Sequence, residues 1–389
     1  MFDYIKYPHF VALLIAFIFA DAACAIFGRL ARRAGALDAP GTEPYKVQKE
    51  AVPFVGGFGI LLGFVGALLL SLRWDLIESH GFQQFLVDKH TRLMFATVTG
   101  GLATALIGFV DDFTPINAVV KLVALGVLTA VLAQFGLIVN LTPWDAVNWL
   151  ITLIWIVGIM SAFNAIDNTD GVAGVSAGNA AFWIFLIGWG TSAATAQASL
   201  SFMGIALLGA VLGFLRHNRP PARLYLGNGG AFLLGFLIAV SVVHAGWSVN
   251  DALKSAIAPM LLLAYPIFDL GYTVFMRWKQ GIVRNPIQAI VVSGRDHTAH
   301  RLTSLGLPPW GVVFVIAGLN GIGGFAAYVI VRYSPSDAWM SAIVAGVAVV
   351  YACFGFVIRN AVDLRSEVAK ISHRKPTGKT PQLSQTINA

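Results

Sequence analysis

The chain carries the apolar run RLMFATVTGGLATALIGFV from Arg92 to Val110, and the adjacent carboxylates Asp111 and Asp112 follow it directly. About twenty apolar residues suffice for a helix to cross the hydrocarbon layer of a membrane. Acids at the end of such a helix are costly unless they bind something cationic. A lone lysine, Lys121, comes nine residues after the pair. This stretch therefore predicts a membrane protein whose site lies at the membrane edge and handles phosphate.

The composition of the whole chain agrees with a membrane protein. Of its 389 residues, 57% are hydrophobic and 12% are charged, and this charged share is roughly half that of a soluble domain. The two cysteines, Cys24 and Cys353, lie in apolar runs and exclude a disulfide framework or a CxxC metal site. The first apolar segment lacks a cleavable signal pattern, so we expect it to remain as a span.

Apolar runs of membrane-spanning length recur along the chain. We expect an all-α polytopic membrane protein with about eleven transmembrane helices, at approximately 10–31, 53–72, 93–112, 117–138, 147–165, 172–190, 196–216, 230–248, 253–276, 309–332 and 336–359. The polar break from Asp167 to Gly171 is tolerated only where protein or water covers the backbone. Residues 1–359 are thus predicted to form one transmembrane catalytic domain, and residues 360–389 a basic, disordered cytoplasmic tail.

An odd number of spans places the two ends of the chain on opposite sides of the membrane. If the N-terminus is outside, 20 of the 26 Lys and Arg residues fall in inner segments, an excess that satisfies the positive-inside rule. We therefore expect the N-terminus outside and the C-terminus in the cytoplasm. Most of the net charge of +7 then reflects topology and attraction to anionic membrane lipid, and nucleic-acid binding is not needed to explain it.

Every unusual polar cluster falls on the cytoplasmic side in this topology. The clusters are Asp111 and Asp112 at the end of the third span, Asn164, Asp167, Asn168 and Asp170 at the end of the fifth, Gly227-Asn228-Gly229-Gly230 at the start of the eighth, and His297, His300 and Arg301 between the ninth and the tenth. Four segments converging on one surface is the arrangement that an active site requires, whereas a structural explanation would have to hold four times. The clusters therefore predict one site on the cytoplasmic face.

The acidic clusters each have a chemical role and a simpler alternative. The adjacent pair Asp111 and Asp112 suits a magnesium ion or the role of a general base, and the alternative is a solvated helix end. Asp167 and Asp170 share a face if they are helical, so that they can address one metal or substrate. The alternative is that this Asn- and Asp-rich turn only caps helices.

The remaining clusters suit phosphate binding. The glycines before the eighth span let free backbone N–H groups at a helix N-terminus approach a phosphate, and the alternative is that they serve packing. The motif His297-x-x-His300-Arg301 offers charge-assisted hydrogen bonds to a diphosphate. A zinc site and a merely basic loop are the alternatives for that motif.

In their order along the chain, these motifs resemble those of the polyprenyl-phosphate N-acetylhexosamine-1-phosphate transferases, which are of the glycosyltransferase family 4 type. The matching motifs are Lys46-Val-Gln-Lys49-Glu-Ala-Val-Pro53-Phe-Val-Gly56-Gly57, Phe109-Val-Asp111-Asp112 with Lys121, Ala162-Phe-Asn164-Ala-Ile-Asp167-Asn-Thr-Asp170-Gly171, Pro221-Ala-Arg-Leu-Tyr-Leu-Gly227-Asn228-Gly-Gly230 and Asp296-His297-Thr-Ala-His300-Arg301-Leu302. The resemblance runs from about residue 38 to residue 310. Eleven spans with an outside N-terminus are also that family's architecture.

The resemblance implies transfer of N-acetylhexosamine 1-phosphate from a UDP-sugar to polyprenyl (undecaprenyl) phosphate in the bacterial inner membrane, with Mg²⁺ or Mn²⁺ required and UMP released. It implies Asp111 as base or orienter at the lipid phosphate, with Asp112 and Asp167 as further catalytic residues. The implied metal ligands are Asp112, Asp167, Asp170 and Asn228. The implied substrate contacts are Lys49, Lys121, Asn164, Asp170, Gly227, Gly229, His297, His300 and Arg301, with Lys49 on the lipid side and the last three at the nucleotide diphosphate.

Several positions depart from the family pattern. Asn228 stands where a metal-binding acid is usual, Ala231 replaces a serine, Ser161 replaces an asparagine, and Gln48 and Ala299 replace histidines. The lost charge at position 228 should weaken magnesium binding or shift the metal toward the remaining aspartates. A weakened or non-enzymatic homologue therefore stays an alternative. A membrane transporter of a lipid-linked sugar is another, although the polar groups cluster at one face and not at midplane.

The last motif bears on the sugar. His297-Thr-Ala-His300 resembles the branch that uses simple UDP-N-acetylhexosamines more than the muramoyl-pentapeptide branch, so UDP-N-acetylglucosamine is the expected donor, for cell-envelope polysaccharide such as lipopolysaccharide or O antigen. Direct attack by the lipid phosphate and a covalent aspartyl intermediate both stay open, as does a homodimer. Two further acids, Asp21 and Asp269, lie in or near spans and either line a pathway or pair within the bundle.

Overall fold

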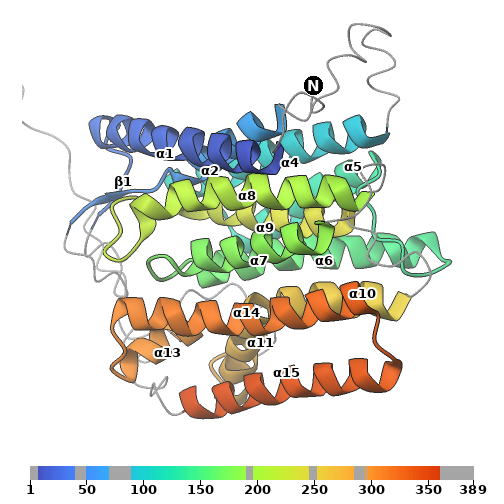
Figure 1. The fold of residues 1–389 in the computed structure, drawn as a ribbon. Coiled ribbons are helices and arrows are strands. Elements are labelled where there is room, and N and C mark those ends of the chain that lie inside the picture. The colour runs from blue at the N-terminus through green and yellow to red at the C-terminus, as the bar shows by residue number, and fades with distance from the viewer. Residues whose placement is uncertain are drawn as a thin grey trace, which may run out of the picture.

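Helices make up most of the described chain, and they run side by side in stacked layers (Figure 1). This computed structural model describes residues 8–39, 50–69, 89–189, 196–244, 252–283, 294 and 296–359. The predicted tail and the predicted lipid-side residue Lys49 lie outside these residues.

The helices follow the apolar runs of the sequence. Their bounds are α1 Pro8–Ala34, α2 Gly56–Leu69, α4 Lys89–Phe113, α5 Ala118–Ala133, α6 Asp145–Ile166, α7 Val172–Gly188, α8 Ala196–Asn218, α9 Gly227–His244, α10 Ala252–Leu262, α11 Ala264–Lys279, α13 Thr298–Ser304, α14 Pro309–Tyr333 and α15 Asp337–Ile358. Two short strands, β1 (Leu37–Asp38) and β2 (Val52–Pro53), pair antiparallel with Leu37 opposite Pro53.

Within the described residues, six helices are long and apolar enough to cross a membrane over most of their length: α1, α4, α6, α8, α14 and α15. The pair α10 and α11 makes a seventh candidate, and α2, α5, α7 and α9 are shorter apolar helices. Each of the eleven expected ranges therefore coincides with an apolar helix or with the bent pair. The class of an all-α polytopic membrane protein is supported, while the number of eleven spans and the orientation stay predictions.

The expected ninth span, 253–276, is not one straight helix. Helices α10 and α11 meet at Leu263 with a bend of 76°. Pro259 lies inside α10, and Pro266 lies in the first turn of α11, where it has no N–H to donate back along the chain. Because proline removes this bond and crowds the preceding turn, a sharp bend forms here. The bend points α11 away from the layers of parallel helices (Figure 1).

Helix α9 lies at the centre of the bundle, where it packs against α2, α4, α6, α7 and α8. Its side chains, from Leu233 to Val240, are almost fully buried. Glycines bring its first turn against the neighbouring backbones. A Cβ at Gly108 of α4 would lie 2.5 Å from the Gly229 backbone, and one at Gly57 of α2 would lie 2.3 Å from the Cα of Gly230. Larger residues there would push α4 and α2 away from α9.

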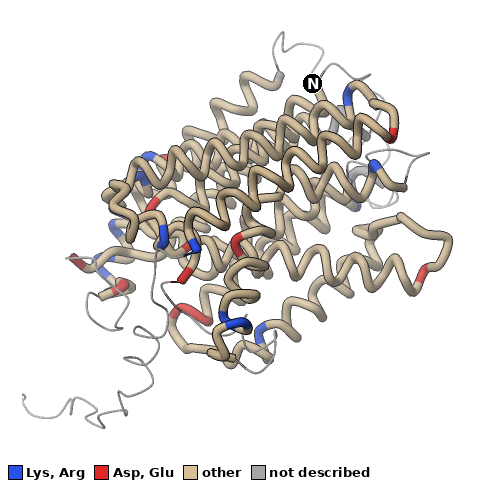
Figure 2. Tube along the Cα trace, turned by 90° about the horizontal axis from the view of Figure 1, so that it is seen from below, with Lys and Arg blue, Asp and Glu red and all other residues tan. Residues whose placement is uncertain are grey.

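One end of the bundle holds most of the polar features. The β1–β2 ribbon, the α6–α7 turn, the end of α8, the start of α14 and α13 all lie toward the left in Figure 1. Figure 2 shows acidic and basic residues gathered mainly toward the same end. The sequence predicted that the polar clusters lie at one membrane surface. In the structure, the segments that carry them lie toward one end of the helix bundle.

Candidate active site

The carboxylate of Asp111 lies at the end of α4 and is fully engaged. Its Oδ2 accepts from Lys121 Nζ at 2.5 Å and from Asn228 Nδ2 at 2.9 Å, and its Oδ1 accepts from the backbone N–H of Ile116 at 2.9 Å. The side chain is 4% exposed and that of Lys121 is 18% exposed. Asp111 therefore joins the end of α4, the start of α5 and the start of α9. The lysine that the sequence singled out nine residues away is its direct ion partner.

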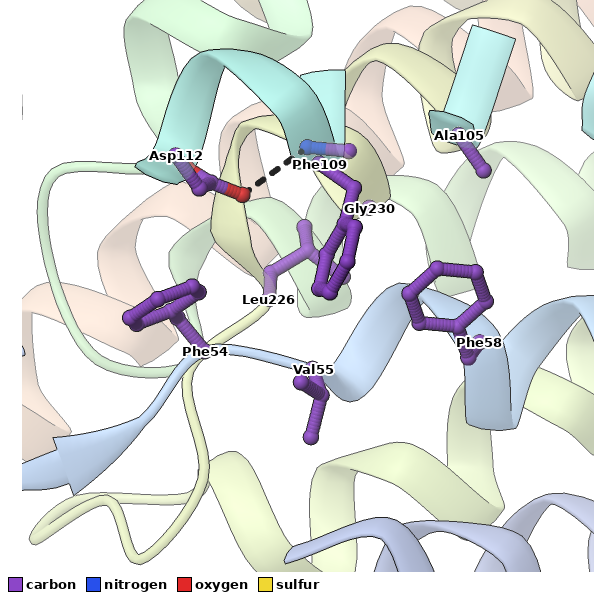
Figure 3. Close-up of a pocket in the computed structure, with 10 residues that line it drawn as sticks. Phe54, Val55, Phe58, Ala105, Phe109, Asp112, Leu226 and Gly230 are labelled. Atoms are coloured by element: carbon purple, nitrogen blue, oxygen red, sulfur yellow. Dashed lines mark hydrogen bonds between the residues drawn. The ribbon is translucent and has the colours of Figure 1, made fainter. Parts of the chain in front are cut away.

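The carboxylate of Asp112 lies at the N-terminus of α9. Its Oδ1 accepts from the backbone N–H of Asn228 at 3.0 Å. Its Oδ2 accepts from the backbone N–H of Gly229 at 3.4 Å, the bond that is dashed in Figure 3. A helix N-terminus attracts anions because its first N–H groups lack helical partners. The N–H groups that the sequence assigned to a phosphate are thus occupied by an internal carboxylate. Phosphate contact at Gly227 and Gly229 stays a prediction, and at Gly229 it requires Asp112 to share or release the N–H from which it accepts.

The side chain of Asn228 bridges two other elements. Its Nδ2 donates to Asp111, and its Oδ1 accepts from Nδ2 of Asn164 on α6 at 2.7 Å. A carboxylate can only accept, so the amide nitrogen of Asn228 must face Asp111 and its oxygen must face Asn164. The oxygen that the sequence offered to a metal is thus already bonded. Its role as a metal ligand stays a prediction.

Asp167 and Asp170 lie in the turn between α6 and α7 and are not helical, so the condition for a shared helix face is not met. Asp167 is the C-cap residue of α6, and Oδ2 of Asp170 accepts from the backbone N–H of Ala222 at 2.9 Å. Asp167 accepts no side-chain hydrogen bond and pairs with no cation within the described residues. When it is ionised, Asp167 therefore has no cationic partner among the described residues.

Burial raises the pKa of Asp167 well above its ordinary range, and the nearby negative charges of Asp112 and Asp170 raise it further. Burial also raises the pKa of Asp170, although its bond from Ala222 opposes the shift. The charges of Asp112 and Asp170 act on Asp167 because they lie close to it. The turn and the end of α4 therefore form one electrostatic unit, as the sequence predicted.

These residues fit a hard divalent cation that is shared with a substrate. Their donors are oxygens, and ionised Asp167 would have no cationic side chain beside it within the described residues. No three His, Cys, Asp or Glu side chains of the described residues lie close enough to enclose a metal by themselves. Mg²⁺ is commonly held by one or two carboxylates together with phosphate oxygens and water, so an open site of this kind suits it. The metal stays a prediction.

An apolar crevice adjoins Asp112. It encloses about 10 Å³ and is lined by Phe54, Val55, Phe58, Phe109, Leu226 and neighbouring glycines of α2 and α9, with Asp112 at one side (Figure 3). Phe109 packs edge-on against Phe58 at 5.0 Å and against Phe113 at 4.8 Å, measured between ring centroids. The side of the site that faces α2 is therefore apolar, while the side that faces the α6–α7 turn is polar.

The His297 motif forms a separate buried network. Nδ1 of His297 lies 2.7 Å from Asp269 Oδ2 on α11, and Asp269 Oδ1 accepts from the N–H and the hydroxyl of Thr298. Arg277 forms a bidentate ion pair with Asp296. Asp269, like Asp21 beside His217 and Arg216, is thus an acid paired within the bundle, one of the two roles that the sequence left open.

Arg301 is fully buried beneath this network. Its Nε donates to the carbonyl of Asp296 at 2.7 Å, and its guanidinium lies 5.5 Å from the ring centroid of Tyr272. Within the described residues, the side chains of His297 and Arg301 form hydrogen bonds with α11 and with the carbonyls of Asp296 and Arg359, and none with α4, α6 or α9. The structure thus joins three of the four predicted clusters by hydrogen bonds. Contact of His297, His300 and Arg301 with a nucleotide stays a prediction.

Sequence reasoning missed two residues that hold the site. Asn218 is buried, accepts from the Gly171 N–H at 3.0 Å and donates to the Leu224 carbonyl at 2.9 Å. Ala222 supplies the backbone N–H that binds Asp170. Both fix the α8–α9 loop to the α6–α7 turn. A buried asparagine at a helix end was the available signal for Asn218, whereas nothing marked an alanine that acts through its backbone.

Comparisons with known proteins confirm the family resemblance. Residues 94–246 match the family model described as glycosyl transferase family 4, a range that runs from α4 through α9 and contains all the acids of the site. A protein of Bacillus subtilis named “Probable undecaprenyl-phosphate N-acetylglucosaminyl 1-phosphate transferase” is 27% identical over 354 residues, which is 88% of this chain and 89% of the relative.

Two further relatives have related names. “Decaprenyl-phosphate N-acetylglucosaminephosphotransferase” of Mycobacterium tuberculosis is 27% identical and covers 82% of this chain and 81% of its own. “Phospho-N-acetylmuramoyl-pentapeptide-transferase” of Lacticaseibacillus paracasei is 26% identical and covers 72% of this chain and 85% of its own. The similarity thus spans most of both chains in each case, and the three names describe transfer of a phosphorylated amino sugar.

Proposed function

Because the chain belongs to glycosyl transferase family 4, we propose that it transfers N-acetylhexosamine 1-phosphate from a UDP-sugar to a polyprenyl phosphate such as undecaprenyl phosphate. The products are a polyprenyl-diphosphate sugar and UMP. The reaction would take place at the cytoplasmic surface of a bacterial inner membrane. The relatives' names support the class of reaction, and the paired acids at one end of the bundle support the site.

The observation that carries the proposal is the meeting of Asp111, Asp112 and Asp167 from distant parts of the chain. Asp111 and Asp112 are tied to the N-terminus of α9, and Asp167 lies near enough to Asp112 for the two charges to affect each other. Lys121 adds a single positive charge beside them. This arrangement suits a reaction in which two phosphates must be brought together despite their mutual repulsion.

The proposed step is a displacement at phosphorus. An oxygen of the lipid phosphate forms a bond to the phosphorus that carries the sugar, and the bond from this phosphorus to the bridging oxygen of UDP breaks. UMP leaves with that electron pair. A phosphate monoester has a second pKa of about 6, so the lipid phosphate is already ionised near neutral pH and needs no strong base. Asp111 would therefore orient the lipid phosphate, and Lys121 would balance its charge.

A magnesium ion is the cofactor that the acids suit, with manganese as the alternative. Asp112 and Asp167 would hold it, with Asp170 in support. When bound, it would neutralise charge on the phosphate oxygens and help the UMP group to leave. The two N–H groups of α9 that bind Asp112 would keep this carboxylate oriented throughout.

Polarity favours distinct places for the two substrates. The crevice beside Asp112, at about 10 Å³, is too small for an isoprenoid chain. The apolar rings of Phe54, Phe58 and Phe109 nevertheless make this side of the site the one that suits the lipid substrate. The α6–α7 turn, with Asp167 and Asp170, is polar and suits the nucleotide sugar. UDP-N-acetylglucosamine is the donor that we propose, for synthesis of cell-envelope polysaccharide.

The proposal is tested by incubating the purified protein with undecaprenyl phosphate, Mg²⁺ and each of several UDP-sugars, and measuring UMP. Release of UMP with UDP-N-acetylglucosamine, and only when the lipid phosphate is present, is the expected result. Hydrolysis of the nucleotide without lipid would contradict the acceptor, and UMP from another sugar alone would change the donor.

One observation favours a second candidate, a homologue with weakened catalysis. The Asn228 amide is engaged on both sides by Asn164 and Asp111, and so the site lacks one acid that the family pattern contains. Such a protein would bind UDP-sugar and lipid in the same assay and release no UMP.

A further inference from the structure

A basic pocket lies beside the acids, at the end of α8. It encloses about 300 Å³ and is lined by Arg216, His217, Arg219, Pro220, Pro221, Arg223 and Trp310. None of these residues lines the apolar crevice beside Asp112, and no residue of the predicted acid site lines the pocket. The basic pocket is thus distinct from the site of the proposed transfer.

The pocket carries positive charge that its surroundings do not balance. Asp21 of α1 pairs with both Arg216 and His217, at 2.6 and 2.8 Å. No ion pair joins the exposed guanidinium groups of Arg219 and Arg223 to any residue that the structure describes. Arg32 adds a further positive charge, because its Nη2 donates to the Arg223 carbonyl at 3.1 Å. Arginine presents a planar fork of donors that fits the oxygens of a phosphate.

The position of the pocket indicates the level of lipid headgroups. The candidate span in α8 ends at Asn218, and the candidate span in α14 begins at Pro309. Trp310 lies in the first turn of α14 and is 44% exposed. Tryptophan is enriched where hydrocarbon meets headgroups, since its ring is apolar and its N–H is polar. The pocket therefore combines an interfacial aromatic, at the end of two spans, with two arginines that form no ion pair with any described residue.

The pocket wall is linked to the acid site. The loop that carries Arg219 and Arg223 also supplies the Ala222 N–H that binds Asp170. Asn218, at the start of that loop, binds the Gly171 N–H in the α6–α7 turn. A ligand that fixes this loop would therefore fix the surroundings of Asp170.

We propose that the basic pocket binds the phosphate of an anionic phospholipid headgroup, at the same membrane surface as the acid site. Basic pockets between transmembrane helices at this level suit anionic headgroups. The bound lipid is not a substrate. It holds the α8–α9 loop against the α6–α7 turn.

The test compares two double variants that lose the same charge. Arg219→Gln with Arg223→Gln removes the unpaired charges of the pocket, and Arg29→Gln with Arg33→Gln removes two exposed arginines of α1 that do not line it. Native mass spectrometry of the purified full chain, titrated with phosphatidylglycerol or phosphatidylcholine, measures lipid binding directly. Lipid binding is measured without any transfer activity, so this test of the pocket is independent of the proposed function.

Wild-type protein is expected to bind phosphatidylglycerol in preference to phosphatidylcholine. The pocket variant should lose about fivefold in affinity for each arginine, and so roughly 25-fold for both, while the α1 variant changes far less. A charge-retaining variant, Arg219→Lys with Arg223→Lys, should lie between wild type and the glutamine variant. Equal losses in both glutamine variants would overturn the proposal in favour of general surface charge. Displacement of the lipid by millimolar inorganic phosphate or UMP would overturn it in favour of a soluble phosphate ligand.

Discussion

Asn228 donates a hydrogen bond from its side-chain nitrogen to Oδ2 of Asp111 across 2.9 Å. An acid at position 228 could not make this bond, because a carboxylate has no proton to donate near neutral pH. The site is therefore organised by an amide at a position where the family pattern has a charge. The first prediction follows from this bond.

The Asn228→Asp variant should be less stable than wild type without metal. The substitution loses a hydrogen bond to a charged group, which contributes about 1.5–3 kcal/mol, and places two carboxylates against each other. A divalent cation should restore the stability by neutralising them. Thermal unfolding in detergent, with Mg²⁺ or EDTA, measures both effects. Asn148→Asp is the matched control, since the buried Asn148 amide also donates a hydrogen bond, to the Thr142 carbonyl at 2.8 Å, but lies at the other end of α6 from the acids. An equal response to Mg²⁺ in the two variants would contradict the prediction.

The Lys121→Met variant should lose about 2 kcal/mol of stability, a value between those of exposed and buried ion pairs. The reason is that Asp111 then lacks its cation. Adding Asp111→Asn to Lys121→Met should recover much of this loss, because the buried carboxylate is no longer charged. A double-mutant cycle on unfolding free energies gives the coupling. Additive effects of the two substitutions on the unfolding free energy would show that the ion pair does not stabilise the fold. Neither the single nor the double variant is expected to transfer sugar phosphate.

Asp167 should make the metal-free protein sensitive to pH. Burial and the charges of Asp112 and Asp170 raise the pKa of Asp167 in the folded state, so the folded protein holds a proton that the unfolded chain has released. Stability with EDTA should then fall as pH rises from the ordinary carboxyl range through this raised pKa, by at most about 1.4 kcal/mol per pH unit for one proton. Unfolding midpoints across the pH range measure the slope.

The Asp167→Asn variant should be at least as stable as wild type at neutral pH, and its stability should depend less on pH. It should also lose transfer activity, by about 10²- to 10³-fold. Higher stability together with lower transfer activity would indicate that Asp167 serves the reaction and not the fold. A loss of stability in Asp167→Asn would instead assign this carboxylate a structural role.

Much of this site follows from local patterns. The acids after Val110, the polar break at 167–171 and the glycines before α9 were predicted as one site, because polar groups at span ends have few structural reasons to be there. The paired state of Asp21 and Asp269 was one of two roles left open. The α6–α7 turn and the limits of α4 also agree with the expected spans to within a few residues.

Other parts depend on contacts that the sequence does not encode locally. The occupation of the α9 N-terminus by Asp112 needs α4 and α9 to touch through Gly108 and Gly229. The bend between α10 and α11 was missed because the whole stretch is apolar, and only the proline spacing hints at it. Full burial of Arg301 depends on α11 and α15, since a charged side chain in a loop is normally exposed.

The Asp269→Asn variant tests whether the His297 network serves the nucleotide. Asp269 accepts from Thr298 and contacts Nδ1 of His297, so it fixes the direction in which the other ring nitrogen points. If His297 contacts the nucleotide, the variant should raise the KM for UDP-sugar and leave the KM for the lipid unchanged. Asp21→Asn is the control, because Asp21 pairs with His217 in a comparable way outside the acid site. Equal changes in both KM values would indicate a general loss of structure.

The most direct test of the central claim follows labelled sugar phosphate from UDP-N-acetylglucosamine to undecaprenyl phosphate, in equal amounts of folded wild type and Asp112→Asn. With Mg²⁺, wild type should form labelled lipid and UMP in a ratio of one to one, while EDTA or the Asp112→Asn substitution should abolish both. Undiminished transfer in EDTA, or in Asp112→Asn, would contradict a metal-dependent site built on the acids of α4 and the α6–α7 turn.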